Sequence, residues 1–248
     1  HEINNPTNFV HVSTQNLEID LSRFQQFLFG LVGDDADEAI LDSFKERFEP
    51  LYTHLETIKK GTERIKIIVK DLRAFTQLDS AEQKTVKITD LLQSMVNLVQ
   101  TRYQKVAEFS IQFDATPELY CYPAQLNQVF MNLIVNACDA IECRLAGLQG
   151  VRASKVKGRV VIGCQTLVHG GHSGHSGQSV IEVFVSDNGC GMTDDVKNHL
   201  FEPFFTTKEV GKGTGLGLSI AFGIVQKHGG ELLVESELGV GSVLRVRL

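Results

Sequence analysis

Apolar residues recur every seven positions at the start of the chain. The series runs from Ile3 through Val10, Leu17, Phe24 and Leu31, and Leu21 and Leu28 fill the second apolar position of the same heptad. This spacing predicts an amphipathic helix with a coiled-coil-like stripe. The helix should end near residues 30–33, where two glycines precede an acidic run that caps a short following helix.

A second series begins after Pro50, a residue that suits the first turn of a new helix. Its members alternate spacings of four and three: Leu51, Leu55, Ile58, Thr62, Ile65, Val69, Leu72 and Thr76. Two long helices joined by a connector predict an antiparallel hairpin. One hairpin cannot bury its whole apolar stripe, so we expect two copies to form a four-helix bundle. A monomeric bundle completed by the rest of the chain is the alternative.

After Asp79 the periodicity is mixed. Helical spacing covers 89–106, 124–145 and 216–228, and strand-like alternation covers 108–114, 159–168, 179–186, 231–235 and 242–248. These elements predict an α+β fold, in which the N-terminal helical hairpin precedes an α/β sandwich with helices on one face of a mixed sheet. Acidic side chains outnumber basic ones over 1–80 but nearly balance them over 81–248, which predicts two domains with these bounds.

The composition narrows the class of protein. The 248 residues are 42% hydrophobic and 22% charged, which is typical of a globular chain and excludes disordered or fibrous ones. The net charge of −6 argues against nucleic acid as the main ligand, because a phosphate backbone requires a basic surface. No apolar run is long enough to span a membrane, so any membrane contact would come through segments outside this chain.

The cysteines also indicate a cytoplasmic location. Five are present and none forms a CxxC pair: Cys121, Cys138, Cys143, Cys164 and Cys190. They lie in apolar or glycine-rich segments, and we interpret them as reduced, small core residues.

Asp187 directly follows a predicted strand and begins the segment Asp187-Asn188-Gly189-Cys190-Gly191-Met192. A carboxylate at a strand end can accept a hydrogen bond from an amino group, and alternating glycines let the backbone approach a flat ligand. The same pattern is common in hairpin turns, so by itself it leaves both interpretations open.

A second glycine-rich segment opens the last predicted helix. It reads Gly211-Lys212-Gly213-Thr214-Gly215-Leu216-Gly217-Leu218. Glycine-rich backbone at a helix N-terminus supplies free N–H donors and the positive end of the helix dipole, which together favour a phosphate group. The spacing is not that of a Walker A loop.

Asn132 and Asn136 lie four residues apart and therefore share one face of an otherwise apolar predicted helix. Two amides on such a face need hydrogen-bond partners. They could be core asparagines that cap nearby loops. A magnesium–phosphate site explains them better, because Mg²⁺ prefers oxygen ligands and is usually held by few protein groups together with phosphates.

Together these segments resemble the sensor histidine kinases of two-component signalling, whose ATP-binding fold is shared with gyrase. The segment around Asn132 and Asn136 is similar to the family's N box, Asp187–Gly191 to its G1 box, 201–208 to its F box and Gly211–Leu218 to its G2 box. The resemblance implies that Asn136 coordinates Mg²⁺ on the ATP phosphates, that Asp187 binds the adenine amino group, and that a mobile lid lies between Met192 and Thr214. The implied nucleotide-binding residues are Asn132, Asn136, Asp187, Gly189, Gly191, Phe204, Lys208, Gly211, Lys212, Gly213, Thr214, Gly215, Leu216, Gly217 and Leu218.

The first residues, His1-Glu2-Ile3-Asn4-Asn5-Pro6, resemble the family's H box. The resemblance implies that His1 is the phospho-acceptor, that Glu2 activates its imidazole, and that Asn5 orients water when the partner is dephosphorylated. A neutral imidazole nitrogen is a competent nucleophile near neutral pH, and a neighbouring carboxylate can take up its proton. Asn5 lies one helical turn after His1 and so shares its face.

We therefore expect a protein histidine kinase, the cytoplasmic core of a sensor, with ATP and Mg²⁺ as cofactors. It would form a homodimer through residues 1–80, phosphorylate His1 and pass the phosphoryl group to an aspartate of a response-regulator receiver domain, with an accompanying phosphatase activity. Two alternatives stay open at this point. One is a gyrase-like ATP-driven clamp, which would need a transducer domain after Leu248, and the other is a non-catalytic dimeric scaffold.

Overall fold

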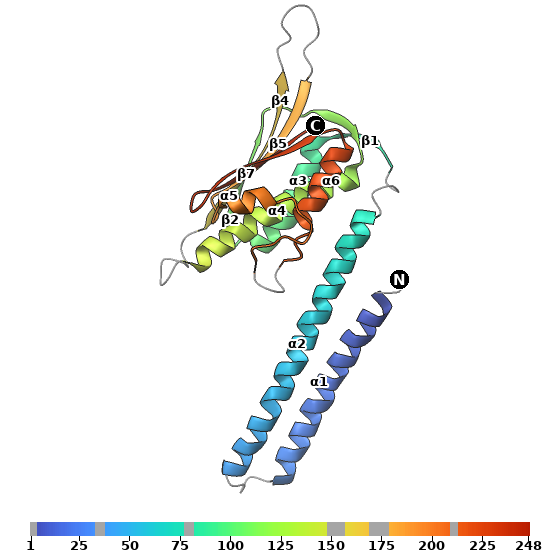
Figure 1. Ribbon diagram of the computed structural model, residues 1–248, viewed down its shortest axis with the longest axis vertical. Helices are drawn as coiled ribbons and strands as arrows, with labels where there is room; N and C mark the ends of the chain where they lie inside the picture. The colour runs from blue at the N-terminus through green and yellow to red at the C-terminus, as the bar shows by residue number, and fades with distance from the viewer. Residues whose placement is uncertain (1–3, 33–37, 77–81, 148–156, 169–178, 209–212) are drawn as a thin grey trace, which may run out of the picture. The chain divides into compact units, whose positions relative to one another are not determined.

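The computed structural model describes residues 4–32, 38–76, 82–147, 157–168, 179–208 and 213–248 (Figure 1). The chain divides into two compact units. The first holds two long helices and extends to Ala74, and the described residues Lys208, Gly213 and Thr214 group with it. The second begins at Phe75 and holds the sheets and the other helices. Among the described residues, no helix is long and apolar enough to cross a membrane.

The first unit is an antiparallel helical hairpin of α1 (Asn4–Val32) and α2 (Glu38–Thr76). Two contacts between the helices fix their antiparallel register: the Lys59 ammonium lies 2.6 Å from the Glu18 carboxylate, and the Tyr52 hydroxyl donates to Gln25 Oε1 over 2.8 Å. The predicted hairpin is therefore present, and α1 ends where the glycines indicated.

The predicted helix boundary at Pro50 is wrong. Pro50 lies inside α2, which runs without interruption from Glu38. A proline within a helix removes one backbone hydrogen bond and crowds the preceding turn. Here the apolar stripe continues on both sides, because Phe48 and Leu55 are buried and the Phe48 ring contacts Phe24 of α1, while Pro50 itself is exposed. Burial of these flanking side chains offsets the lost hydrogen bond.

Each helix of the hairpin carries two stripes. One stripe is buried between the helices and contains Thr7, Thr14, Phe48, Leu55 and Thr62. The other is exposed, and on each helix its large apolar members are seven residues apart: Val10, Leu17, Phe24 and Leu31 on α1, and Leu51, Ile58 and Ile65 on α2. The hairpin therefore uses one heptad position for its own packing and leaves the second largely exposed within this unit, although the half-exposed Phe24 ring also contacts Phe48 of α2.

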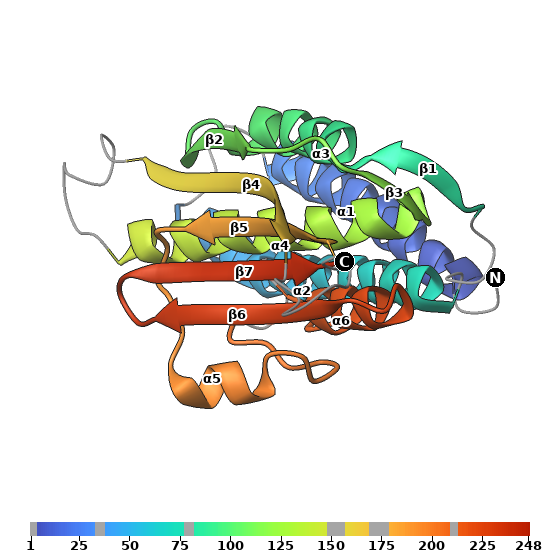
Figure 2. The ribbon, with the colours of Figure 1, turned by 90° about the horizontal axis from the view of Figure 1, so that it is seen from above.

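The second unit is built on a five-stranded mixed sheet (Figure 2). Its strands are β2 (Ala107–Phe113), β4 (Gly158–Val168), β5 (Ser179–Asp187), β7 (Gly241–Arg247) and β6 (Glu231–Glu237), in that spatial order. β2 and β4 are parallel, and the other neighbours are antiparallel. The five strands coincide with the five predicted from alternation, and the predicted α+β fold class is confirmed.

Three helices cover one face of this sheet: α3 (Ile88–Tyr103), α4 (Pro123–Ala146) and α6 (Gly217–Lys227) (Figure 2). All three were predicted to within a few residues. The sequence patterns missed the short pair β1 (Lys84–Lys87) and β3 (Glu118–Cys121), and the six-residue α5 (Asp194–His199). Elements of four to six residues are too short to show a period.

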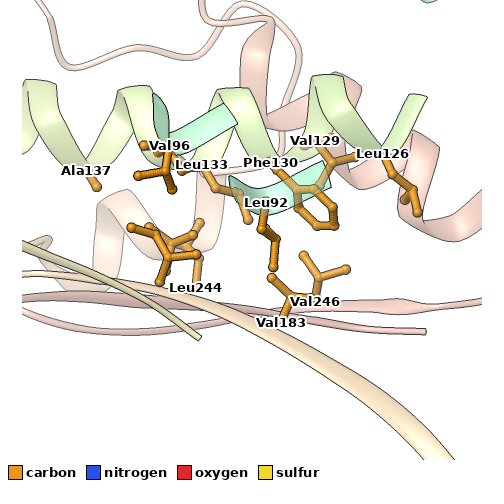
Figure 3. Close-up of a cluster of buried hydrophobic side chains, with 14 of the residues drawn as sticks. Leu92, Val96, Leu126, Val129, Phe130, Leu133, Ala137, Val183, Leu244 and Val246 are labelled. Carbon is orange, nitrogen blue, oxygen red and sulfur yellow. The ribbon is translucent and has the colours of Figure 1, made fainter. Parts of the chain in front are cut away.

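The core of this unit lies between α4 and the sheet (Figure 3). Leu126, Phe130 and Leu133 of α4 are fully buried, and the Phe130 ring points toward Val183 of β5 and Val246 of β7. Each buried aliphatic or aromatic side chain of this size contributes roughly 1.5–3 kcal/mol. The burial of one face fixes the rotation of α4 about its axis, and hence the direction of its polar residues.

All five cysteines are free thiols, but not all are core residues. Cys121, Cys138 and Cys164 are buried as predicted, and burial raises the pKa of Cys138 to about 12. Cys190 is half-buried and Cys143 is exposed. The core assignment is therefore wrong for Cys143, because it lies on the exposed side of α4, whereas Ile141 and Leu145 in the same turns pack into the core.

Candidate functional site

α4 presents two polar side chains beside its buried face. Asn132 donates a hydrogen bond from Nδ2 to the backbone carbonyl of Gly217 over 2.7 Å, which links α4 to the first residue of α6. Asn136 lies one turn further along α4 and is half-buried. The Asn132 side chain therefore uses one of its N–H donors for this cap at the start of α6. The role of Asn136 as a metal ligand stays a prediction.

Asp187 is the last residue of β5, and its side chain is buried. Oδ1 accepts a hydrogen bond from the Gly189 backbone N–H over 2.7 Å, and the carboxyl group also interacts with the Ser242 backbone of the neighbouring strand β7. Burial raises the pKa of Asp187 to about 6, although both backbone contacts lower it. At neutral pH the site therefore holds a buried carboxylate that can accept a hydrogen bond from a ligand.

The segment after Asp187 packs directly onto α4. The Cys190 N–H donates to the Ala140 carbonyl over 3.0 Å, and the Arg144 guanidinium donates to the Asn188 carbonyl. A Cβ on Gly189 would lie 2.6 Å from the Ala140 backbone, so only glycine permits this approach. The predicted G1 and N boxes are thus in backbone contact.

Two serines that the sequence analysis did not single out support this segment from the opposite side. Ser236 Oγ of β6 accepts from the Met192 N–H over 2.9 Å and lies 2.9 Å from Ser242 Oγ of β7. The two serines are register partners in the β6–β7 pair. Strand alternation predicts that both serines face inward. It does not predict the contact of Ser236 with Met192, because the two residues are 44 positions apart in the chain.

The predicted F and G2 boxes are joined in a similar way. The Phe204 N–H donates to the Gly215 carbonyl over 3.0 Å. Both residues have positive φ values, 69° for Phe204 and 68° for Gly215, and a Cβ on Gly215 would collide with the Phe204 backbone. This contact places the start of α6 next to the exposed Phe204 side chain.

We expect Gly215→Ala to lower the free energy of unfolding of the chain. An L residue at this φ costs about 1–2 kcal/mol, and the backbone clash with Phe204 adds to this cost. Gly223→Ala in α6 is the matched control, since nothing lies within 4 Å of its Cβ position and alanine is the better helix former. Urea unfolding monitored by circular dichroism should show opposite shifts for the two variants. Equal shifts would contradict the strained contact.

The remaining predicted residues are only partly placed. Leu216 is buried, and Gly217 and Leu218 begin α6. Lys208, Gly213 and Thr214 belong to the segment that groups with the helical unit, and Gly211 and Lys212 lie outside the described residues. His1 and Glu2 also lie outside them, and only the backbone of Asn5, in α1, is described. α5 lies within the predicted lid, whose mobility stays a prediction.

The placed residues form one connected site. α4 bonds to the segment after Asp187 on one side and to the start of α6 on the other. The first N–H groups of a helix have no partners within the helix and attract anions, whereas a carboxylate such as Asp187 accepts from amino groups. The arrangement therefore suits a ligand with an amino group at one end and phosphates at the other.

Comparison with known proteins identifies the family. Residues 121–248 match the family described as histidine kinase-, DNA gyrase B-, and HSP90-like ATPase. The chain belongs to this family. The match begins at the end of β3 and includes α4, Asp187 and α6, so this ATPase family unit contains every placed residue of the site.

Among members of this family, the chain is similar to sensor histidine kinases, as its motifs predicted. It is 33% identical over 210 residues to the sensor kinase CckA of Brucella abortus (strain 2308), covering 81% of this chain and 20% of CckA. It is 28% identical over 243 residues to the sensory histidine kinase/phosphatase NtrB of Azospirillum brasilense, covering 96% of this chain and 50% of NtrB. The chain thus spans a fifth to a half of the length of these relatives.

A solved structure supports the fold. Full-length ShkA in complex with AMPPNP matches with a TM-score of 0.56 at 21% identity, over 79% of this chain and 38% of ShkA. At this identity the match shows a shared fold.

Proposed function

We propose that the chain is the kinase core of a sensor histidine kinase, which transfers the γ-phosphoryl group of Mg²⁺-ATP to His1. The observation that supports this most directly is the double connection of α4, through Asn132 to Gly217 and through Ala140 to Cys190. These two hydrogen bonds connect the segments predicted as the N, G1 and G2 boxes, which supports a nucleotide site shared by them. The relatives named as sensor kinases and the AMPPNP bound to ShkA agree with this assignment.

The side chains present fit ATP and Mg²⁺. Asp187 offers a buried carboxylate to the adenine amino group, and the start of α6 offers N–H groups to phosphate. Asn136 offers an amide oxygen, the type of ligand that Mg²⁺ prefers. Bound Mg²⁺ would neutralise charge on the phosphates during transfer.

The chemistry at the acceptor belongs to His1 and Glu2. Glu2 would take the imidazole proton, the free ring nitrogen would form a bond to the γ-phosphorus, and the bond from phosphorus to the ADP oxygen would break. Lys208, Lys212 and the backbone of the G2 box would stabilise charge on the phosphates. Because phosphoryl transfer depends mainly on positioning and charge neutralisation, these groups carry most of the rate enhancement.

Incubation with ATP labelled in its γ-phosphate tests this function. The chain should acquire label that is lost in acid and kept in alkali, as expected for a phosphoramidate. His1→Gln should abolish the label, whereas His54→Gln, which changes an exposed histidine of α2, should retain it. No label, or label that survives acid, would overturn the kinase assignment and favour the scaffold or the clamp.

We also propose that a second copy covers the exposed stripe of the hairpin in a four-helix bundle. The stripe consists of large apolar residues at heptad spacing on both helices, with Phe24 and Leu31 54% and 67% exposed. Burial of each such side chain is worth roughly 1.5–3 kcal/mol, which strongly favours association.

The whole chain should therefore sediment as a dimer, and the double variant Leu17→Glu/Leu31→Glu as a monomer, because two charges on each copy of α1 would enter the apolar interface. Val12→Glu is the control, since Val12 is similarly exposed but lies off the stripe. Circular dichroism should show unchanged helix content in all variants. A dimeric double variant would contradict the proposed interface.

The proposed partner of phosphorylated His1 is an aspartate of a response-regulator receiver domain, and we place this exchange, with the accompanying phosphatase reaction, in the cytoplasm. Attack by the aspartate carboxylate would form the acyl phosphate and release the imidazole. In the phosphatase reaction, Asn5 would hold the water molecule that hydrolyses the aspartyl phosphate of the receiver domain.

Asn5→Ala should separate the two activities. Labelling of His1 does not need an amide at position 5, so it should stay within about twofold of wild type, whereas decay of a phosphorylated receiver should slow toward its intrinsic rate. Both are measured by gel autoradiography over time. Equal loss of both activities would show that Asn5 acts through the structure of α1 instead.

A further inference from the structure

Two cysteines meet beside the nucleotide site, although they are 47 residues apart in the chain. Cys190, in the segment after Asp187, donates its backbone N–H to the Ala140 carbonyl of α4 over 3.0 Å, and its thiol interacts with that of Cys143, near the end of the same helix. Cys143 is exposed and Cys190 is half-buried, so solvent reaches the pair. The other three cysteines are buried.

Backbone contacts hold the pair together. The Cys190 N–H is bonded to the Ala140 carbonyl, and Cys143 lies three residues after Ala140, on the same side of the helix. The Arg144 side chain holds the Asn188 carbonyl on the next turn. The Cys190 carbonyl also accepts from the Gly239 N–H over 2.7 Å. The proximity of the two thiols is therefore set by main-chain geometry on both elements.

We propose that Cys143 and Cys190 form a reversible disulfide that lowers the affinity of the site for Mg²⁺-ATP, with a peroxide as the oxidant. The effect on affinity rests on the proposed nucleotide binding. The disulfide itself does not.

The two thiols have different roles in the oxidation. Cys143 is the accessible nucleophile: its sulfur attacks the O–O bond of hydrogen peroxide, which gives a sulfenic acid and one water. The Cys190 sulfur then attacks the Cys143 sulfur, the S–S bond forms, and the hydroxyl group leaves with the Cys190 proton as a second water. Two thiols and one peroxide thus become one disulfide and two waters. Burial and the Cys143 contact raise the pKa of Cys190 to about 11, so little Cys190 thiolate is present at neutral pH and Cys190 is not the thiol that reacts with peroxide first.

The disulfide would act on nucleotide binding through Gly189 and Asp187. A covalent S–S bond is shorter than a contact between two thiols, so its formation draws Cys190 toward α4. Gly189 is already in contact with Ala140 and cannot follow without moving its N–H, which holds the Asp187 carboxylate. Displacement of this carboxylate weakens its hydrogen bond to the adenine amino group.

The experiment treats the reduced whole chain with hydrogen peroxide and then removes the excess. Intact mass should fall by two hydrogens per chain, and peptide mapping without reduction should find the Cys143–Cys190 cross-link. Calorimetric titration with Mg²⁺-ATP should show at least about fivefold weaker binding, restored by dithiothreitol. Cys143→Ser is the control: it should bind like the reduced wild type and should not respond to peroxide.

Absence of the cross-link at peroxide levels that leave the buried cysteines intact would overturn the proposal. A cross-linked chain with unchanged ATP affinity would overturn it equally, as would peroxide sensitivity that persists in Cys143→Ser. If the reduced wild type binds no ATP, the proposed function fails, and the mass measurement still decides whether the disulfide forms.

Discussion

Asn136→Ala is expected to weaken Mg²⁺-ATP binding at least about 100-fold, which corresponds to roughly 2.7 kcal/mol. The reason is that the variant removes the proposed protein ligand of the metal ion, while the other contacts with ATP depend on the same ion to neutralise the phosphates. The fold should be retained, because alanine has a higher helix propensity than asparagine and the buried face of α4 is unchanged. Calorimetric titration and thermal unfolding measure the two quantities separately.

Asn97→Ala is the matched control for this variant. Asn97 is an exposed residue of α3 whose side chain accepts a hydrogen bond from Gln93, one turn earlier on the same helix. The same substitution there should leave ATP affinity unchanged. Wild-type affinity in Asn136→Ala would rule out the metal-ligand role, and a loss of affinity that accompanies unfolding would assign Asn136 to the structure of α4.

Asp187→Asn is expected to lose ATP binding and yet to unfold at a higher temperature than the wild type near pH 7. Burial raises the pKa of Asp187 to about 6 from its ordinary value of 3.8. Between these two values the folded chain binds more protons than the unfolded chain, so the stability of the wild type falls as the pH rises through this window. Two pKa units correspond to a loss on the order of 3 kcal/mol in the free energy of unfolding of the wild type at neutral pH, where Asp187 is ionised.

Asparagine removes this cost because it is uncharged and keeps a carbonyl oxygen for the Gly189 N–H. The gain is partly offset, since one amide oxygen replaces the two carboxylate oxygens. The amide nitrogen of the variant would meet the adenine amino group donor to donor, which explains the loss of ATP affinity. Stability and binding should thus change in opposite directions.

The measurement is the unfolding temperature of both chains without nucleotide from pH 4 to pH 8. The advantage of Asp187→Asn should grow up to about pH 6 and then level off. Asp194→Asn is the control with the opposite sign. The Lys197 ammonium lowers the pKa of this exposed carboxyl group, so ionised Asp194 stabilises the folded chain at neutral pH, and this stabilisation is lost as the pH falls. A difference for Asp187→Asn that does not depend on pH would contradict the effect of burial.

The sequence contains local patterns whose physical origin is itself local. The heptads of the first 76 residues predicted the hairpin, because a helix repeats its faces every seven residues whatever it packs against. The five strands and the three long helices followed from period and length in the same way. The boxes in their order resembled those of sensor histidine kinases before any geometry was known, and the family match over residues 121–248 agrees with that resemblance.

Pro50 shows where local rules fail. Its ring favours a helix start, but the hairpin buries Phe48 and Leu55 on either side of it, and tertiary packing keeps the helix continuous. Local propensity, which is worth about 3 kcal/mol for proline, is outweighed by the burial of two large side chains.

Contacts between distant segments depended on the tertiary structure alone. The hydrogen bonds from Asn132 to Gly217 and from Met192 to Ser236 join residues far apart in the chain. Neither bond can be predicted from a periodic pattern in the sequence. The sequence alone determined the two long helices through their heptads, the five strands through their alternation, and the resemblance to the kinase family through the box motifs. Only the packing of α4 against the sheet decided which amide meets α6, how deeply Asp187 is buried, and that Cys143 lies beside Cys190, because each depends on how a helix is rotated against strands from elsewhere in the chain.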